Sequence, residues 1–441
     1  SQGRSPNDSE KAALAVEWDG LNELAGVQTA ITAADAAFLK DMLKFYHEIA
    51  QQNANSKDLK LQSGRAYRRV ANCYHLIGDW SQAIQAYSEA IGIYTDLVQN
   101  EPENESLLLQ LTQIHNETGQ AFRRKGEQSE AIRYHQRAIK HLEDSPIASQ
   151  AIVRLEVART LNLLCTAETG LVGEVQRVPP SVSEDYFGLQ SGRRPAVAAF
   201  GGRLGDRRRT ENMVRRQKGW LEQAIRITDL LLLENPDDDA ARLVRAKSLR
   251  GLAVLLDPAV QAEQFKQLIA DATQQIELLQ TKYPTDPQYT YSLALTYTIP
   301  LALQDATAVE FLEKAAVLTK TLCADFPQNM EFHQLNSNVH VELAKLMFDQ
   351  EKDDDGIECL DAAANSLSHL VQTAPNLLYY RLEYGNVSLA LSKKLSDKKL
   401  VRRAIAVLER STADSRAAEE KVPLQQRLLN LEIRQYQALA D

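Results

Sequence analysis

A short acidic run is the part of this sequence that looks most like a site for chemistry. Asp353, Asp354 and Asp355 precede Gly356, as in the first half of a calcium-binding loop. Such a loop ends with a glutamate that coordinates calcium through both carboxylate oxygens, whereas this chain has Ala362 at the corresponding position. We therefore interpret the run as a solvated turn between two helices.

Histidines and catalytic motifs provide no stronger candidate. His333 and His340 lie seven residues apart on a predicted helix, so they cannot share a metal ion without a third ligand nearby. The chain has no Walker loop, Gly-x-Ser-x-Gly elbow, His-Glu-x-x-His helix or protein-kinase signature, and its glycines at 201, 202 and 205 lack a phosphate-binding spacing. The sequence predicts no metal site, no cofactor, no small-molecule substrate and no enzyme.

The composition predicts a soluble protein with a substantial core. Hydrophobic residues make up 44% of the chain and charged residues 25%. The four cysteines lie far apart, which predicts neither a zinc site nor a disulfide framework. No stretch reaches the length of a membrane span, and the N-terminus does not resemble a signal peptide.

The net charge of −9 argues against a dedicated nucleic-acid-binding protein. One segment is nevertheless basic. It could be a solvated linker, a contact for an acidic protein surface, or a site for nucleic acid or anionic lipid, and the scarcity of aromatic residues favours the linker. Its arginines are Arg193, Arg194, Arg203, Arg207, Arg208, Arg209, Arg215 and Arg216.

Alanine recurs at one position of a helical pattern along most of the chain. The spacings between successive copies are 48, 86, 48, 43, 48 and 41 residues, and five copies are followed twelve residues later by proline. A unit near 48 residues with one oversized copy predicts a helical solenoid, in which each unit buries its apolar face against its neighbours. The alanines are Ala90, Ala138, Ala224, Ala272, Ala315, Ala363 and Ala404. The paired prolines are Pro102, Pro236, Pro284, Pro327 and Pro375.

Each proline should end a helix, because it cannot continue the backbone hydrogen-bond ladder and disfavours helix at the residue before it. An Asp or Asn beside the proline can cap the next helix. The predicted caps are Asn104, Asp237, Asp286, Asn329 and Asn376.

The residue types in the first two units resemble the tetratricopeptide repeat. Small residues allow two antiparallel helices to approach closely, and aromatic residues fill the spaces beside them. In the first unit these are Tyr67, Val70, Ala71, Tyr74, Gly78, Asp79, Trp80, Ala83, Tyr87 and Ala90. In the second they are Gly119, Phe122, Gly126, Ala131, Tyr134 and Ala138, with His115 and His135 at positions where aromatic residues are usual. The resemblance implies an all-α, right-handed α-solenoid of hairpins, each with a helix A and a helix B longer than standard.

The domain organisation follows from this pattern. Residues 1–32 are a polar extension that is partly disordered, and residues 33–169 hold the N-terminal repeats, with a lone helix B at 33–52. Residues 170–210, rich in Pro, Gly and Arg, form a mostly disordered loop inserted into the third repeat between a helix ending near Glu168 and one beginning near Glu211. Residues 211–441 hold divergent repeats, with a capping helix at 423–439.

One stripe of each helix A lines the concave surface of tetratricopeptide arrays, and the resemblance places ten polar residues there. They should point away from the contact between helices A and B, and so be free to bind. Arginines and amides suit an acidic peptide or a free carboxylate, although the stripe could also be the solvated face of amphipathic helices. The residues are Arg65, Arg68, Asn72, His75, Gln113, Asn116, Gln120, Arg123, Arg159 and Asn162.

Two of these residues match the carboxylate clamp of chaperone-binding tetratricopeptide proteins. Arg68 and Asn72 correspond to its first two positions, but Glu117 stands where the clamp has an asparagine. This departure weighs against binding of a carboxylate in the manner of the clamp.

Residues 43–91 resemble the repeat tail of bacterial membrane-anchored serine/threonine protein kinases. The likeness extends through "LNLLCTAETG", the arginine-rich interruption and "LLLENPDD", and covers roughly residues 43–256. It implies a protein-binding sensor or scaffold attached to a kinase, with a membrane anchor upstream of Ser1 and tethering to the inner membrane. The alternative is a stand-alone cytoplasmic adaptor that assembles a multiprotein complex. Neither hypothesis predicts an oligomeric state.

Overall fold

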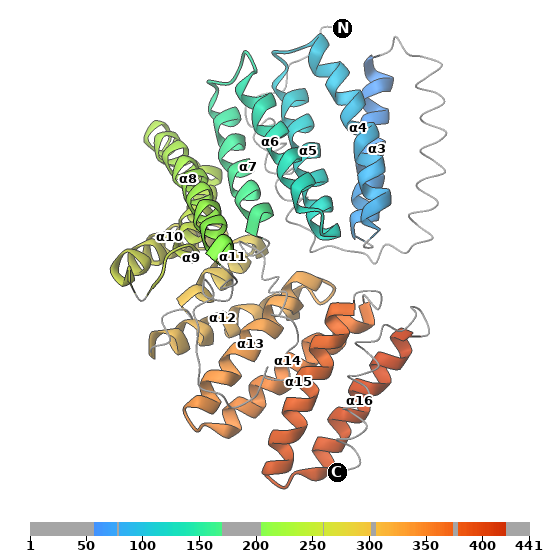
Figure 1. Ribbon diagram of the computed structural model, residues 1–441, viewed down its shortest axis with the longest axis vertical. Helices are drawn as coiled ribbons and strands as arrows, with labels where there is room; N and C mark the ends of the chain where they lie inside the picture. Colours follow the sequence, from blue (N-terminus) through green and yellow to red (C-terminus); the bar gives the residue numbers. More distant parts are fainter. Residues whose placement is uncertain are drawn as a thin grey trace. The chain divides into compact units, whose positions relative to one another are not determined.

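The described part of the chain is built from α-helices. A computed structural model describes residues 57–76, 79–169, 204–258, 260–300, 306–373 and 378–419, and Figure 1 shows its helices. The first group is α3 (Lys57–Leu76), α4 (Trp80–Asn100), α5 (Glu105–Lys125), α6 (Gln128–Glu143), α7 (Ala151–Thr169), α8 (Leu204–Glu234), α9 (Asp239–Val254) and α10 (Ala262–Lys282). The second is α11 (Pro287–Tyr297), α12 (Ala306–Asp325), α13 (Met330–Asp349), α14 (Asp353–Thr373), α15 (Leu378–Asp397) and α16 (Val401–Glu419).

The helices belong to two compact units. The N-terminal unit contains α3 to α10, and the C-terminal unit contains α12 from Val309 onward together with α13 to α16. Helix α11 contributes to both, with its residues up to Ala294 in the C-terminal unit and those from Leu295 in the N-terminal unit. The two helices that flank the segment predicted as a loop, α7 and α8, both lie in the N-terminal unit.

Within each unit, helices that follow one another in sequence pack side by side as hairpins. In the N-terminal unit this holds for every successive pair from α3 to α10, and in the C-terminal unit for α13 to α16. Helices α4, α5, α10 and α14 each have 21 residues, which is long for a repeat of about 34 residues. The predicted all-α hairpin array with long helices is confirmed, and the handedness of the array stays a prediction.

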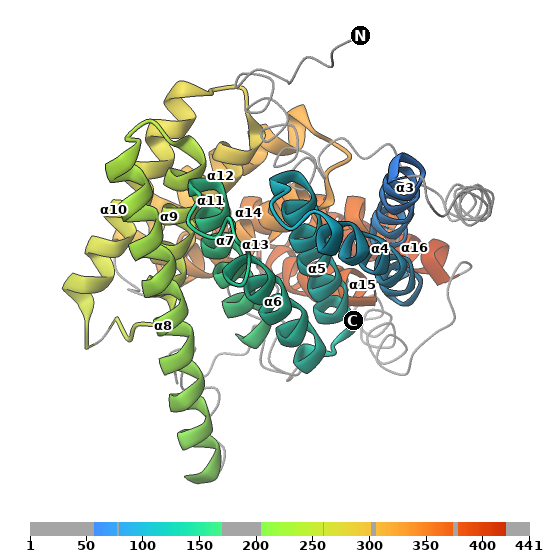
Figure 2. The ribbon, with the colours of Figure 1, turned by 90° about the horizontal axis from the view of Figure 1, so that it is seen from above.

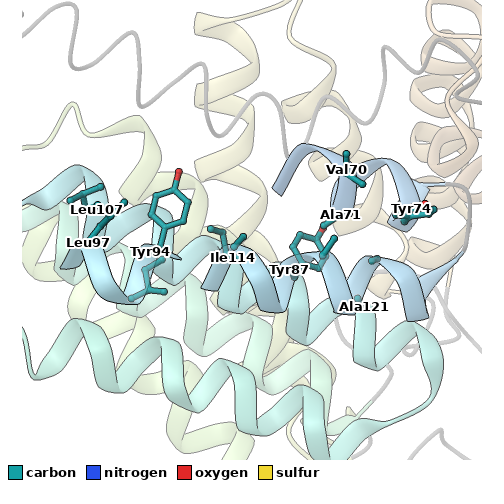
Figure 3. Close-up of a cluster of buried hydrophobic side chains, with 13 residues drawn as sticks. Val70, Ala71, Tyr74, Tyr87, Tyr94, Leu97, Leu107, Ile114 and Ala121 are labelled. Atoms are coloured by element: carbon teal, nitrogen blue, oxygen red, sulfur yellow. The ribbon is translucent and has the colours of Figure 1, made fainter. Parts of the chain in front are cut away.

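The alanine register is confirmed by burial. Six of the seven recurring alanines have no exposed surface, and Ala404 is 4% exposed. A side chain this small allows the neighbouring helix to approach closely. In the first repeats, Ala90 lies in one core cluster with Tyr87 and Tyr94, and Figure 3 shows the rings of these two tyrosines lying among aliphatic side chains.

Proline ends the helices as predicted. Helices α4, α8, α10 and α12 each stop two residues before a proline of the twelve-residue pattern, because the pyrrolidine ring disfavours helix at the residue before it. The caps agree at three positions. Asp286, before the first residue of α11, accepts a hydrogen bond from the Gln288 backbone N–H at 2.9 Å. Asn104 accepts a hydrogen bond from the Leu107 backbone N–H at 3.2 Å, and Asn329 accepts one from the Glu331 backbone N–H at 2.9 Å.

Two predicted boundaries are wrong, and a third interpretation changes. Asp238, not Asp237, caps α9 and accepts a hydrogen bond from the Ala241 backbone N–H at 2.9 Å. Helix α8 begins at Leu204, seven residues before Glu211, and Figure 2 shows its first turns extending beyond its neighbours. Arginines at 207–209 are good helix formers, so the helix continues into the basic segment. The acidic run predicted as a turn forms the first helical turn of α14.

Several predictions lie outside the described residues. These are the helices at 33–52 and 423–439, the loop at 170–203, the glycine at 78 and the cap at 376. Among the described helices, none combines the length and apolar composition that crossing a bilayer requires.

Candidate functional site

In the N-terminal unit, the first helices of successive hairpins, α3, α5, α7 and α9, correspond to the predicted helices A. Polar side chains join these helices to one another. Helix α5 contacts α7, and α7 contacts α9. Asn116 on α5 donates a hydrogen bond from Nδ2 to Thr160 Oγ1 on α7 at 2.9 Å. Asn162 on α7 donates from Nδ2 to Ser248 Oγ on α9 at 3.0 Å. An amide therefore connects α5 to α7, and another connects α7 to α9.

The first link of this series is an ion pair. Arg68 on α3 donates from Nε to Glu117 Oε2 on α5 at 2.9 Å and from Nη2 to Glu117 Oε1 at 2.5 Å, and Gln113 accepts a further hydrogen bond from Nη2 at 3.2 Å. Burial is the largest single influence on the Arg68 guanidinium and would lower its pKa, but the charge and hydrogen bonds of Glu117, together with Tyr87 and Tyr94, raise that pKa overall. The bidentate geometry compensates two buried charges.

This pair explains the departure from the carboxylate clamp. Arg68 is only 6% exposed and Glu117 only 7%, so the arginine is neutralised within the protein. The clamp's second position is also occupied, because Tyr87 donates its hydroxyl hydrogen to Asn72 Oδ1 at 2.6 Å. A side chain held in this way stabilises the hairpins and has little capacity left for a ligand carboxylate.

The ten predicted site residues therefore differ in their burial and in their internal hydrogen bonds. Arg68 and Asn116 are buried, so the expectation that they are free of packing is wrong. Asn72 and Asn162 are half-buried and hold internal hydrogen bonds. Arg65 is exposed. The other half-buried residues are His75, Gln113, Gln120, Arg123 and Arg159. Of these, Gln113 accepts from Arg68, and Arg159 pairs with Glu156 on its own helix at 3.2 Å.

Two histidines that replace aromatic residues of the repeat lie in the contact between α5 and α6. His135 is fully buried, and its Nδ1 lies 2.9 Å from Asn116 Oδ1. Gly119 makes room for that ring, since a Cβ there would lie 2.8 Å from His135 Nε2. His115 stacks on His141 with ring centroids 5.2 Å apart. Burial is the main cause that lowers the pKa of both His115 and His135 to about 3, so both rings are neutral near pH 7.

In the C-terminal unit, α15 presents one side to α13. The Tyr380 hydroxyl donates to Gln334 Oε1 on α13 at 3.1 Å. Three residues further along α15, Glu383 is 6% exposed, and the charged groups that act on it are Lys345 and Glu342 of α13. Sequence reasoning missed Glu383, although a glutamate among the apolar and aromatic residues of a predicted helix A was a signal that could have identified it.

No described part of the chain brings together three or more His, Cys, Asp or Glu side chains that could hold a metal ion. The four cysteines are free thiols. Burial raises the pKa of Cys165 and Cys323 to about 12, so these thiols are protonated at neutral pH and lack the thiolate that reactive cysteines require.

Among known proteins, this chain is similar only to proteins of solved structure. No family model matches the chain, and no curated protein matches it. A tetratricopeptide repeat protein from Parabacteroides merdae is 13% identical, with 85% of this chain and 99% of that chain covered and a TM-score of 0.32.

Two other solved structures come from named regulatory proteins. Nro1, described as a nuclear import adaptor and hypoxic regulator of sterol synthesis, is 10% identical over 80% of this chain and 99% of its own, with a TM-score of 0.45. A Rap protein complexed with competence and sporulation factor is 12% identical over 91% and 99%, with a TM-score of 0.37. These values are too low to carry an argument, so the description of a tetratricopeptide-like array rests on the chain's own helices.

Proposed function

We propose that this chain is a non-catalytic scaffold or sensor region that binds a protein partner on the helix A face of its N-terminal unit. The series of polar links between α3, α5, α7 and α9 supports the proposal. Those links hold consecutive helices A beside one another, and a fixed row of helices offers an extended segment several contacts at once. Binding sites with such preorganisation lose less entropy when a partner binds.

The side chains that reach solvent on this face determine the kind of partner. Arg65, Gln120, Arg123 and Arg159 are exposed or half-buried, and we propose them as the contacts. Guanidinium groups bind carboxylates through charge-assisted hydrogen bonds, and amides bind a peptide backbone. The partner would therefore be an acidic peptide segment or a free carboxyl terminus, while Arg68, Asn72, Asn116 and Asn162 hold the helices in place.

A binding measurement on the full chain tests this proposal. The probe is a fluorescein-labelled peptide of alternating glutamate and alanine, compared with a lysine–alanine peptide of equal length. We expect the combined variant Arg65→Glu and Arg123→Glu to weaken binding of the acidic probe by about tenfold or more, because two charge-assisted contacts are lost. The control is Arg133→Glu on α6, which pairs with Glu130 of its own helix. Equal affinity of the combined variant and the parent would exclude the proposed contacts.

The finer part of the proposal concerns the protein to which the chain belongs. We propose that it is the repeat region of a bacterial membrane-anchored serine/threonine kinase and that partner binding regulates the kinase. The resemblance of residues 43–256 supports this assignment, and the alternative is an independent adaptor. Sequencing the reading frame upstream of Ser1 distinguishes them, since a kinase catalytic loop followed by an apolar span supports the first, and a start codon within a few residues supports the second.

A further inference from the structure

Helix α6 is shorter than its counterparts in the other repeats. Helices α4, α8, α10, α12 and α14 each end ten residues after the recurring alanine, whereas α6 ends at Glu143, five residues after Ala138. Pro146 lies eight residues after Ala138 instead of twelve, and a proline cannot continue the helix. Five residues correspond to about 7.5 Å of helix, so α6 lacks more than one turn that its counterparts have.

The missing turn carries a core residue in the other repeats. In α4, α8, α10, α12 and α14 a buried leucine lies seven residues after the alanine, but in the α6 repeat this position is Ser145. Ser145 lies in the connection to α7 and accepts a hydrogen bond from the Ile147 backbone N–H at 3.3 Å. Ala404 is also followed by a serine, Ser411, although α16 continues past it. The leucines are Leu97, Leu231, Leu279, Leu322 and Leu370.

A cavity of about 170 Å³ lies where α6 ends. Its apolar walls are Leu142 of α6, Ala148 of the connection, Val157 of α7 and Ile227 of α8. Leu142 and Val157 belong to the buried core of these repeats, and Ile227 packs against it. Ile147 is buried in the same core, yet the cavity remains. The space beside the shortened helix is therefore continuous with the core that the missing leucine would have joined.

The size of the cavity limits what it can hold. Pockets for drug-sized ligands measure roughly 300–1,000 Å³, whereas an apolar cavity of about 150 Å³ holds a molecule as small as benzene. A cavity of about 170 Å³ therefore fits a single side chain. Its aliphatic walls, and the leucine at this level of five other repeats, favour leucine, isoleucine or methionine.

The polar part of the lining suits a polypeptide backbone. It consists of Glu143, Arg154 and Gln223. Arg154 donates from Nη1 to Glu234 Oε1 at 2.9 Å, but its Nε is buried and has no acceptor among the described residues. A buried donor without an acceptor is costly, and a backbone carbonyl in the cavity would accept its hydrogen. Gln223 is half-buried, and its amide can both donate and accept.

We propose that this cavity binds one aliphatic side chain of a protein partner, and that the Arg154 Nε–H donates to the backbone carbonyl of the same segment. The inference rests on the proposed function, because it requires that the partner is a polypeptide. It adds an apolar anchor, lined by helices B α6 and α8 and the start of α7, to the polar contacts on the helix A face. Side chains that fill such pockets supply much of the binding energy of protein interfaces.

A methyl NMR titration of the full chain tests the proposal. The isoleucine δ1 methyl groups are labelled, and the Ile227 signal is assigned by its loss in Ile227→Val. The probe is acetyl-Ala-Leu-Ala amide, and its matched polar control contains asparagine in place of leucine. We expect the leucine peptide to shift the Ile227 signal saturably and to leave that of Ile276, buried in α10, unchanged. The asparagine peptide should bind about tenfold more weakly or worse, because its amide would be buried without partners.

Two variants of the connection between α6 and α7 provide a matched pair. Ala148→Leu should weaken binding of the leucine peptide by about tenfold or more, because the new side chain occupies the cavity from within the chain. Ser149→Leu should bind as the parent does, since Ser149 is exposed. Circular dichroism checks the fold of both variants, and the comparison of the two peptides on the parent chain needs neither.

The proposal is overturned by an unshifted Ile227 signal with the leucine peptide, by equal affinity for the asparagine peptide, or by undiminished binding to folded Ala148→Leu. Tighter binding of free leucine than of the peptide would assign the cavity to an amino acid and refute a polypeptide ligand. A dimer that Ala148→Leu abolishes would assign it to a second copy of this chain and refute a separate partner. The combined variant Arg65→Glu and Arg123→Glu should bind the leucine peptide as the parent does, so failure of the acidic contacts leaves this measurement intact.

Discussion

Arg68 shows how one residue can be identified correctly by position and yet assigned the wrong role. It lies on helix A as predicted, but its guanidinium is neutralised by Glu117, 49 residues further along the chain. Nothing in a single sequence reveals this partner, because the two residues meet only after two hairpins have stacked. The same argument applies to Asn116 and Thr160, which are 44 residues apart.

We predict that breaking the Arg68–Glu117 pair destabilises the N-terminal unit strongly. Arg68→Met should cost about 3–5 kcal/mol, because it leaves the buried Glu117 carboxylate uncompensated. The double variant Arg68→Met and Glu117→Met should cost less than the single one, since no charge remains. Urea unfolding followed by circular dichroism measures both. If the double variant is less stable than Arg68→Met, the uncompensated charge of Glu117 is not the cause of the destabilisation.

Glu383 gives a second prediction at this scale, in the pH dependence of stability. Its pKa is about 7 in the folded protein and 4.5 as an unperturbed group, so the unfolded chain ionises first as the pH rises. The loss of folding free energy caused by ionising the buried Glu383 carboxylate is absent below pH 4.5 and grows up to pH 7. Above pH 7 it stays constant at up to about 3 kcal/mol.

Glu383→Gln should therefore raise the free energy of unfolding at pH 8 and have little effect at pH 4. Urea unfolding of the parent and variant at both pH values provides the measurement. An equal increase in the free energy of unfolding at pH 4 would show that the charge of the Glu383 carboxylate is not responsible.

At the scale of the helix, small residues and prolines carried most of the predictive information. Close packing excludes larger side chains from the contact between helices, so the alanine slot recurs visibly along the sequence. Helix starts were harder to predict. Asp237 and Asp238 are adjacent and chemically equivalent as caps, and only the backbone geometry selects Asp238. The start of α8 was missed because composition suggested a loop where arginine's helix propensity continued the helix.

The alanine register leads to a prediction that concerns packing alone. Ala90→Leu should destabilise the protein by about 1–3 kcal/mol, because Ala90 has no exposed surface and its neighbours must shift to accept extra volume. Ala270→Leu on α10 is the control, since Ala270 is exposed. Thermal melting compares the three proteins, and equal melting temperatures for Ala90→Leu and the parent would contradict the register.

For the whole molecule, the sequence predicted the class of fold better than its function. The repeat period implies stacked hairpins because no single hairpin can bury its apolar face alone, and this holds for any sequence with the pattern. Binding depends instead on which polar side chains remain unpaired after stacking. Those are decided by contacts between repeats, such as the link from Asn162 to Ser248 across 86 residues.

The Arg68–Glu117 pair also limits how this chain can change during evolution. Since each partner is costly without the other, the two positions should vary together among related proteins, either as a charged pair or as two apolar residues. In a homologue with asparagine at position 117, an arginine at position 68 would no longer form this ion pair. Its guanidinium could then bind a ligand. The residue at position 117 would thus distinguish homologues whose first hairpin binds a ligand from homologues in which the same residues hold neighbouring hairpins together.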